Sequence, residues 1–148
     1  MSQVLVFRIE DELYGLEVTR IQEVVEAPGL HYIPRAPEFF LGAINFHGNI
    51  LPVLDLGAFL GFAPRKNDTR VIVLTSAECS MALATHHIRG FIPHDADALT
   101  PVDQEQKRDS YIRSVMNHDE QMINLLDMDG LLDHLESYMD GTGGKRGA

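Results

Sequence analysis

The stretch "GAINFHGNILPVLDL", residues 42–56, decides the fold of this chain because it reads as two apolar strands folded back on each other. Residues 46–49, Phe-His-Gly-Asn, separate the strands and have the composition of a tight hairpin turn. Asp55 ends the second strand and is placed to cap a short helix over residues 56–61. The stretch therefore predicts a β-hairpin that leads into a helix, with His47 at its tip.

Short apolar runs on both sides of this hairpin predict further strands, separated by turns. Asp127 follows the last of them as the cap of a second helix, so the run from Pro52 to Leu56 resembles the run from Asn124 to Met128. We see no strict internal repeat beyond this shared pattern. The predicted strands are residues 4–9, 13–16, 70–75, 81–84, 88–92, 111–116 and 121–126.

Two segments are predicted to lie outside the strands. Val18, Ile21 and Val24 fall at helical spacing, which favours one or two helical turns before Pro28. Residues 93–109 are rich in Asp, Gln and Pro, which is typical of a solvated loop.

Many short strands with little helix are typical of small antiparallel barrels, so we expect a mainly β fold of two barrels side by side. The polar residues 64–68 form the clearest break in the chain. We therefore expect a single domain over residues 1–140, with two subdomains that divide near residues 64–69 and strands that can cross between them. Residues 141–148 are expected to form a flexible tail.

Composition excludes several classes of function. The chain has 148 residues and 12 Lys and Arg against 22 Asp and Glu, a net charge of −10, which disfavours nucleic acid and anionic lipid as direct ligands. No apolar run approaches the roughly 18 residues of a spanning helix, and residues 1–5 lack the pattern of a secretory signal, so we expect a cytoplasmic protein without direct membrane insertion. The single cysteine, Cys79, excludes an internal disulfide and a multi-thiolate zinc site.

Candidate catalytic chemistry is sparse. The glycines are too dispersed to form a phosphate-binding loop, and no serine has the Gly-x-Ser-x-Gly context of a nucleophile. His86 and His87 are adjacent and would point to opposite faces of a strand, although a two-histidine metal site that combines one of them with His94 or His118 stays open. His47 lacks a neighbouring nucleophile or acid in sequence. We predict no catalytic residue and no metal ligand.

The apolar residues indicate a binding function. Large side chains are more numerous around the hairpin than a small barrel interior holds easily, so some of them could face a partner. The alternative is that all of them belong to the core. They are Ile33, Phe39, Phe40, Leu41, Ile44 and Phe46.

The ordered motifs of the first half resemble the CheW-like domain of bacterial chemotaxis proteins. They are Leu5-Val6-Phe7, residues 11–18, Ile21-Gln22-Glu23-Val24, residues 33–39 and residues 42–56. Residues 69–74, 111–112 and 125–132 extend a weaker resemblance to nearly the whole chain.

This resemblance implies two five-stranded, SH3-like barrels around a shared apolar interface, and a non-catalytic coupling protein without a cofactor. Its expected partners are the cytoplasmic tip of a methyl-accepting chemotaxis receptor and the regulatory domain of a CheA-type histidine kinase. The protein would be cytoplasmic and recruited to membrane-associated receptor arrays. The residues that match partner-binding positions are Ile21, Glu23, Gly42, Asn45, His47 and Gly48.

The chain departs from the family pattern at the hairpin tip. His47 stands where the family usually has an arginine that pairs with the glutamate matched by Glu23, so we expect His47 and Glu23 to be in contact. Residues 82–88 lose a usual glycine and acid, and Ser114 stands where glycine is common. Two alternatives follow: a divergent scaffold in a non-flagellar system, for example one linked to pili, and a small histidine- or metal-dependent enzyme.

Overall fold

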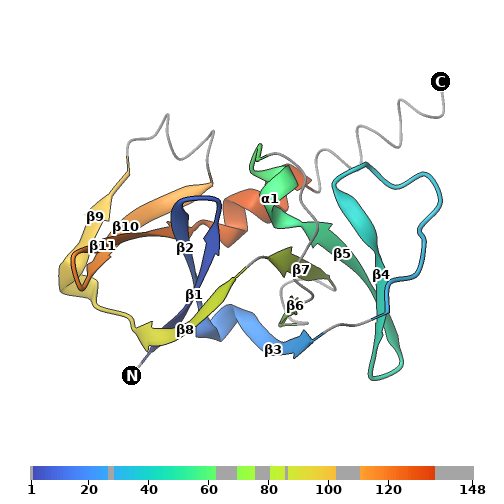
Figure 1. Cartoon of the computed structure of the whole chain (residues 1–148), viewed down its shortest axis with the longest axis horizontal. Helices are drawn as coiled ribbons and strands as arrows, with labels where there is room; N and C mark the ends of the chain where they lie inside the picture. Colours follow the sequence, from blue (N-terminus) through green and yellow to red (C-terminus); the bar gives the residue numbers. More distant parts are fainter. Residues whose placement is uncertain are drawn as a thin grey trace.

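The computed structural model describes residues 2–26, 29–62, 70–75, 81–85, 87–102 and 111–135. Most of them lie in β-strands of two sheets, which confirms the predicted mainly β fold (Figure 1). The strands are β1 Gln3–Ile9, β2 Glu12–Glu17, β3 Ile21–Glu26, β4 Phe40–Phe46, β5 Asn49–Asp55, β6 Arg70–Leu74, β7 Ala82–Thr85, β8 Ile88–Pro93, β9 Leu99–Pro101, β10 Ile112–His118 and β11 Gln121–Leu126.

Within the described residues the helical segments are short. They are the 3₁₀ turns η1 Val18–Arg20 and η2 Ala96–Ala98, the helix α1 Leu56–Phe59, and a C-terminal helix over residues 128–135. Among the described residues, none of these helices is both long and apolar enough to cross a membrane.

The two sheets have the same connectivity. The five-stranded sheet has the order β3-β6-β7-β5-β4, and five strands of the six-stranded sheet have the order β8-β1-β2-β11-β10. In both, the successive pairings are antiparallel, antiparallel, parallel and antiparallel. The sixth strand, β9, lies beside β10, and its counterpart in the five-stranded sheet is a single bridge between His31 and Ala43 beside β4.

The register shows a structural repeat that the sequence did not predict. Both sheets carry irregularities at matching places, one after Ile21 and Ile88 and another after Phe40 and Ile112. On both sides of each irregularity, the strand pairs of one sheet correspond to strand pairs of the other. The difference in residue number between corresponding positions is constant within each segment. Residues 3–7, 15–17 and 21–26 correspond to 70–74, 82–84 and 88–93, and residues 40–55 correspond to 112–127.

The repeats exchange their hairpins. β1 and β2 of the first repeat complete the sheet of the second, where β2 lies parallel to β11, and β6 and β7 of the second complete the sheet of the first. A side-chain hydrogen bond reinforces the pairing of the chain's two ends, because Asn124 Nδ2 donates to the carbonyl oxygen of Leu13 at 2.9 Å. Neither sheet therefore consists of one half of the chain.

Three apolar clusters form the core. The largest lies between the sheets and includes Phe7 and Leu16 of one sheet with Leu54 and Leu83 of the other. Each sheet also encloses a smaller cluster of its own. β1 contributes side chains both to the cluster between the sheets and to the cluster of its own sheet. Leu5, Phe7 and Ile9 belong to the first, and Val4 and Val6 belong to the second.

Both predicted helix caps are confirmed. The amide of Ala58 donates to Asp55 Oδ1 at 3.3 Å, and the amide of Gly130 donates to Asp127 Oδ1 at 3.1 Å. These aspartates occupy corresponding positions of the two repeats. A strand that ends in a capping aspartate therefore turns into a helix at the same point of each sheet.

Two local predictions are wrong. The helical turns expected around residues 18–25 are only the three residues of η1, because Ile21, Val24 and Val25 pair with β6 as the strand β3. The loop expected over residues 93–109 contains η2 and β9, because Ala98 and Leu99 pack against the core of the six-stranded sheet. Residues 103–110, the proposed boundary at 64–69, Cys79, His86 and the tail 141–148 lie outside the described residues.

A methyl group at Gly15 should destabilise the fold. An added Cβ would lie 2.7 Å from Val4 Cγ1 and 2.8 Å from Leu125 Cδ2. We expect Gly15→Ala to lower the free energy of unfolding by about 1–3 kcal/mol in urea titrations. Gly29→Ala is the control, because nothing lies within 4 Å of its added Cβ, and equal stability of the two variants would contradict this packing.

Tyr14 should make stability fall at alkaline pH. Burial, then the charge of Glu12 and the 3.1 Å hydrogen bond from the phenol to Glu12 Oε2, raise the pKa of Tyr14 far above its usual range. Unfolded Tyr14 loses its proton above about pH 10 while the folded residue keeps it, so its contribution is complete below that pH and declines above it. Urea titrations from about pH 8 to 11 should show a shallower decline for Tyr14→Phe, and equal slopes would refute the prediction.

Candidate functional site

The candidate site is built on the tip of the β4–β5 hairpin. His47 and Gly48 have φ values of +50° and +84°, as the two central residues of a type I′ turn require. The amide of Gly48 donates to Asn45 Oδ1 at 3.0 Å, which holds the turn from the last exposed position of β4. The ring of Phe46 contacts the ring of His47 edge to face, with 4.3 Å between centroids. The turn thus presents the imidazole outward from a fixed backbone.

His47 contacts Glu23, as the resemblance predicted. Its Nε2 lies 3.8 Å from Glu23 Oε1, and the two side chains are 72% and 50% exposed. Glu23 belongs to β3 and His47 follows β4, which are the two outer strands of the five-stranded sheet. The contact therefore brings the two outer strands of the sheet together at one end, where both side chains remain accessible.

The other predicted partner-binding residues have different surroundings. Ile21 is half-buried and packs against the core between the sheets, although it belongs to the same strand as Glu23. Gly42 is buried at φ +150°, and an added Cβ would lie 2.7 Å from the carbonyl oxygen of His31. The structure thus brings Glu23, Asn45, His47 and Gly48 together, whereas Gly42 lets the preceding segment lie against β4.

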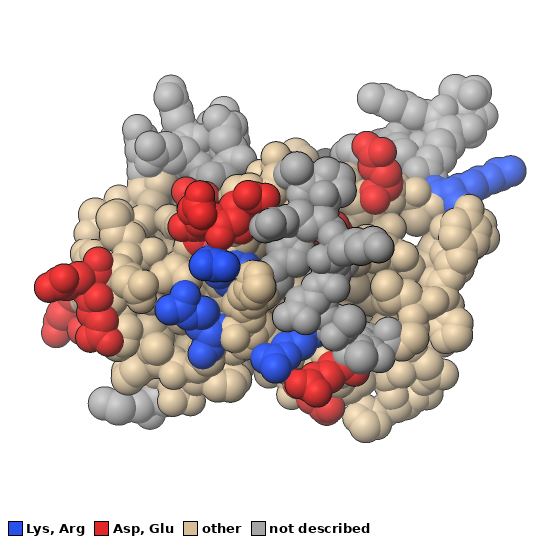
Figure 2. All heavy atoms as spheres, viewed as in Figure 1, with Lys and Arg blue, Asp and Glu red and all other residues tan. Residues whose placement is uncertain are grey.

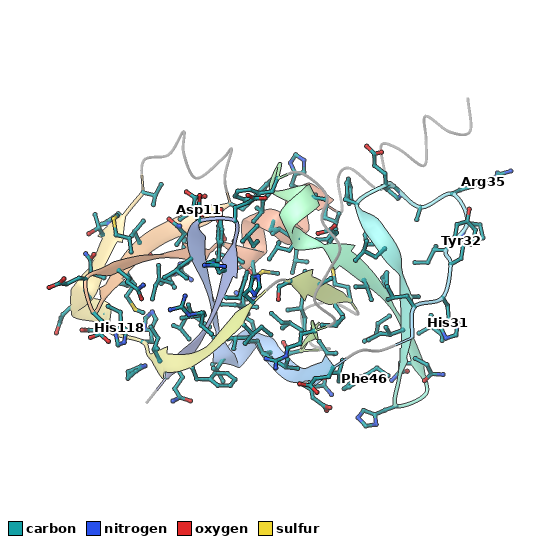
Figure 3. The ribbon with its side chains drawn as sticks, in the orientation of Figure 1. Asp11, His31, Tyr32, Arg35, Phe46 and His118 are labelled. Atoms are coloured by element: carbon teal, nitrogen blue, oxygen red, sulfur yellow. The ribbon has the colours of Figure 1, made fainter. Side chains whose placement is uncertain are left out.

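That segment runs along the outer side of β4. His31 and Ala43 exchange two backbone hydrogen bonds of 2.7 and 2.8 Å. Tyr32 follows His31 and is 85% exposed, and both lie at the outer end of the molecule beyond β4 (Figure 3). The hairpin site is therefore bordered by a segment that presents an aromatic side chain.

The exposed apolar residues differ from those that the sequence indicated. Ile44 and Phe46 belong to the core of the five-stranded sheet, while Phe39, Phe40 and Leu41 are partly buried against the core clusters. The large exposed apolar residues near the site are Leu30, Tyr32 and Ile50. Ile50 lies directly after the turn, and its alternation with buried Leu51 is the signal that could have identified it.

The histidines do not gather at one place. Within the described residues, no group of three or more His, Cys, Asp and Glu is arranged to hold a metal ion. His94 lies 3.7 Å from Glu17, and His118 lies 3.4 Å from Asp119, in separate contacts on the six-stranded sheet. The predicted alternative with His86 involves a residue outside the described ranges.

A double-mutant cycle on Glu23 and His47 should reveal weak coupling. We expect Glu23→Gln and His47→Gln to couple by at most about 1 kcal/mol, because both side chains are exposed. The coupling should be larger when His47→Arg is measured against Glu23→Gln, because a guanidinium supplies a permanent charge and a fork of donors. Urea unfolding measures both couplings, and a value for the arginine variant no larger than that for His47 would contradict a contact between these positions.

Known proteins resemble this chain in sequence and in fold. The profile of the CheW-like domain matches residues 3–136. A probable chemotaxis protein CheW from Rhizobium etli is 24% identical over 140 residues, covering 91% of this chain and 90% of the relative. The chemotaxis protein CheW from Thermotoga maritima is 22% identical over 134 residues, covering 90% and 89%.

A solved structure agrees with the sequence relatives. The crystal structure of the scaffolding protein TtCheW from Thermoanaerobacter tengcongensis superposes with a TM-score of 0.77 at 29% identity, covering 84% of this chain and 88% of that one. The profile match spans both sheets and the hairpin site. The chain belongs to the CheW-like domain family of chemotaxis proteins.

Proposed function

We propose that this chain is a non-catalytic adaptor that couples the cytoplasmic tips of methyl-accepting chemotaxis receptors to the regulatory domain of a CheA-type histidine kinase. In this role it is cytoplasmic and recruited to membrane-associated receptor arrays. It needs no cofactor, because coupling consists of protein contacts alone.

The observation that carries the proposal is the accessible contact between Glu23 and His47 at a fixed hairpin tip. These two residues match a glutamate and an arginine that commonly pair in the family. Ile50 and Tyr32 add exposed apolar area on the same sheet and its bordering segment, and aromatic and charged groups around such area are usual in protein interfaces. Ile21, Glu23, Gly42, Asn45, His47 and Gly48 are the proposed partner-binding residues, with Ile21 and Gly42 acting mainly through the shape of the surface.

A second candidate is a CheW-like scaffold of a chemosensory system with another output, such as pili. His47 favours it, because a histidine lacks the permanent charge and forked geometry of the usual guanidinium. The two candidates share the same surface and differ in the partner that it recognises.

Glu23→Lys should impair coupling. The purified chain is mixed with receptor-containing vesicles and the CheA-type kinase of the same organism, and kinase autophosphorylation and binding are measured. We expect Glu23→Lys to weaken binding about tenfold, because it places two cations together when His47 is protonated. Asp97→Lys on η2 makes the same charge change on the other sheet and should have little effect.

The outcome for the unmodified chain separates the candidates. Binding to the kinase or receptor, with a specific loss in Glu23→Lys, supports the adaptor. If the chain binds neither protein but recovers a non-chemosensory partner from a lysate, and Glu23→Lys abolishes that recovery, the second candidate is correct. Equal losses in Glu23→Lys and Asp97→Lys would contradict a specific role of the hairpin tip.

A further inference from the structure

A second surface feature lies on the six-stranded sheet, away from the hairpin site. A hollow of about 500 Å³ is lined by Arg8 of β1 and Arg89 of β8, with Leu13 and Met122 as its apolar residues. A smaller hollow of about 200 Å³ adjoins it, shares Leu13 and Arg89, and includes Phe91. We refer to the two together as the arginine hollow.

Arg8 and Arg89 form no ion pair with any described residue. Asp11 and Glu12 line the same hollow, so two acids lie beside the two arginines in its lining. Figure 2 shows basic side chains gathered beside an acidic cluster over the N-terminal hairpin. Two arginines without an ion-pair partner among the described residues are notable in a chain with a net charge of −10.

Other described arginines are paired. Arg20 donates to both carboxylate oxygens of Asp129 at 3.0 Å, Arg70 lies 3.3 Å from Glu26, and Arg113 lies 3.7 Å from Glu17. An ion pair with a nearby carboxylate is thus common for the described arginines of this protein. Arg8 and Arg89 depart from it although acids are abundant around them.

A β-bulge in β8 positions Arg89. The register of β8 against β1 passes from Ile88 opposite Phe7 to Gly90 opposite Val6, so Arg89 is the extra residue of a β-bulge, and Gly90 has φ +134°. Bulges redirect side chains and are common beside functional sites. The corresponding residue of the other repeat is Gln22, so the basic character belongs to the six-stranded sheet alone.

Apolar side chains complete the surface. Met122 and Phe91 are 62% and 53% exposed, although each belongs to a type that is usually buried. Arginine, methionine and aromatic residues are enriched in the centres of protein interfaces, where guanidinium groups bind carboxylates in a bidentate manner. The two arginines and the exposed apolar side chains of the hollow therefore fit a segment in which carboxylates alternate with apolar side chains.

We propose that the arginine hollow binds an acidic, apolar segment of a partner protein, with carboxylates on Arg8 and Arg89 and apolar side chains against Phe91 and Met122. This inference does not depend on the proposed coupling at the hairpin tip. The negative net charge disfavours acidic partners at long range, so recognition depends on short-range forked contacts.

The test uses short labelled peptides and the full chain. One peptide alternates Glu with Leu and Phe, and its counterpart has Lys in place of Glu; fluorescence anisotropy measures binding. We expect the acidic peptide alone to bind, and the combined Arg8→Ala and Arg89→Ala changes to weaken it at least about tenfold. The combined changes to Lys should leave an intermediate affinity, because the charge remains and the fork is lost.

Two controls keep the outcome decisive. Arg113→Ala removes a half-exposed arginine of the same sheet and should leave peptide affinity unchanged. Urea unfolding verifies that the variants are folded, and Met122→Ala reports on the apolar contact without a change of charge. The proposal is overturned if the acidic peptide does not bind at about 1 mM, if the Lys peptide binds equally well, or if the folded arginine variants bind as tightly as the unmodified chain.

Discussion

Three residue pairs, Leu13 with Ile123, Tyr14 with Asn124 and Gly15 with Leu125, place β2 parallel to β11. The other structural features depend on this pairing, because it joins residues 110 positions apart and completes the six-stranded sheet. Loop closure over so long a segment has an entropic cost, which burial of the apolar side chains of β1 on both faces helps to offset.

The exchange of hairpins fixes the position of one sheet relative to the other. β1 contributes side chains both to the shared core and to the interior of its own sheet, so movement of one sheet against the other would disturb both clusters. The hairpin tip with Glu23 and His47 belongs to one sheet, and the arginine hollow belongs to the other. A protein built this way holds two separate surfaces in a constant geometry, which suits an adaptor.

Local features of the fold could be predicted from the sequence. The hairpin of residues 42–56 and the caps Asp55 and Asp127 depend on residues only a few positions apart, and turn and capping chemistry operate at that range. Ile21, Val24 and Val25 have helical spacing when the segment is viewed alone, but their pairing with β6, with a register irregularity after Ile21, makes the segment the strand β3.

Long-range features could not be predicted in this way. The repeat is visible in strand register but not in sequence, because corresponding positions share little beyond apolar character, as with Gly15 and Ala82. The contact of Glu23 with His47 was predicted only through the family resemblance, since spacing alone does not bring β3 to the β4–β5 turn. Arg8 and Arg89 meet in one hollow only because β1 pairs with β8.

Hydrogen exchange of backbone amides in the complex tests the placement of the proposed coupling surface most directly. The chain is measured alone and with the regulatory domain of the CheA-type kinase or with the receptor tip fragment. We expect slower exchange of the amides in residues 21–26 and 42–50 when a partner is bound. Unchanged exchange in both segments, together with slower exchange elsewhere in the bound chain, would contradict it.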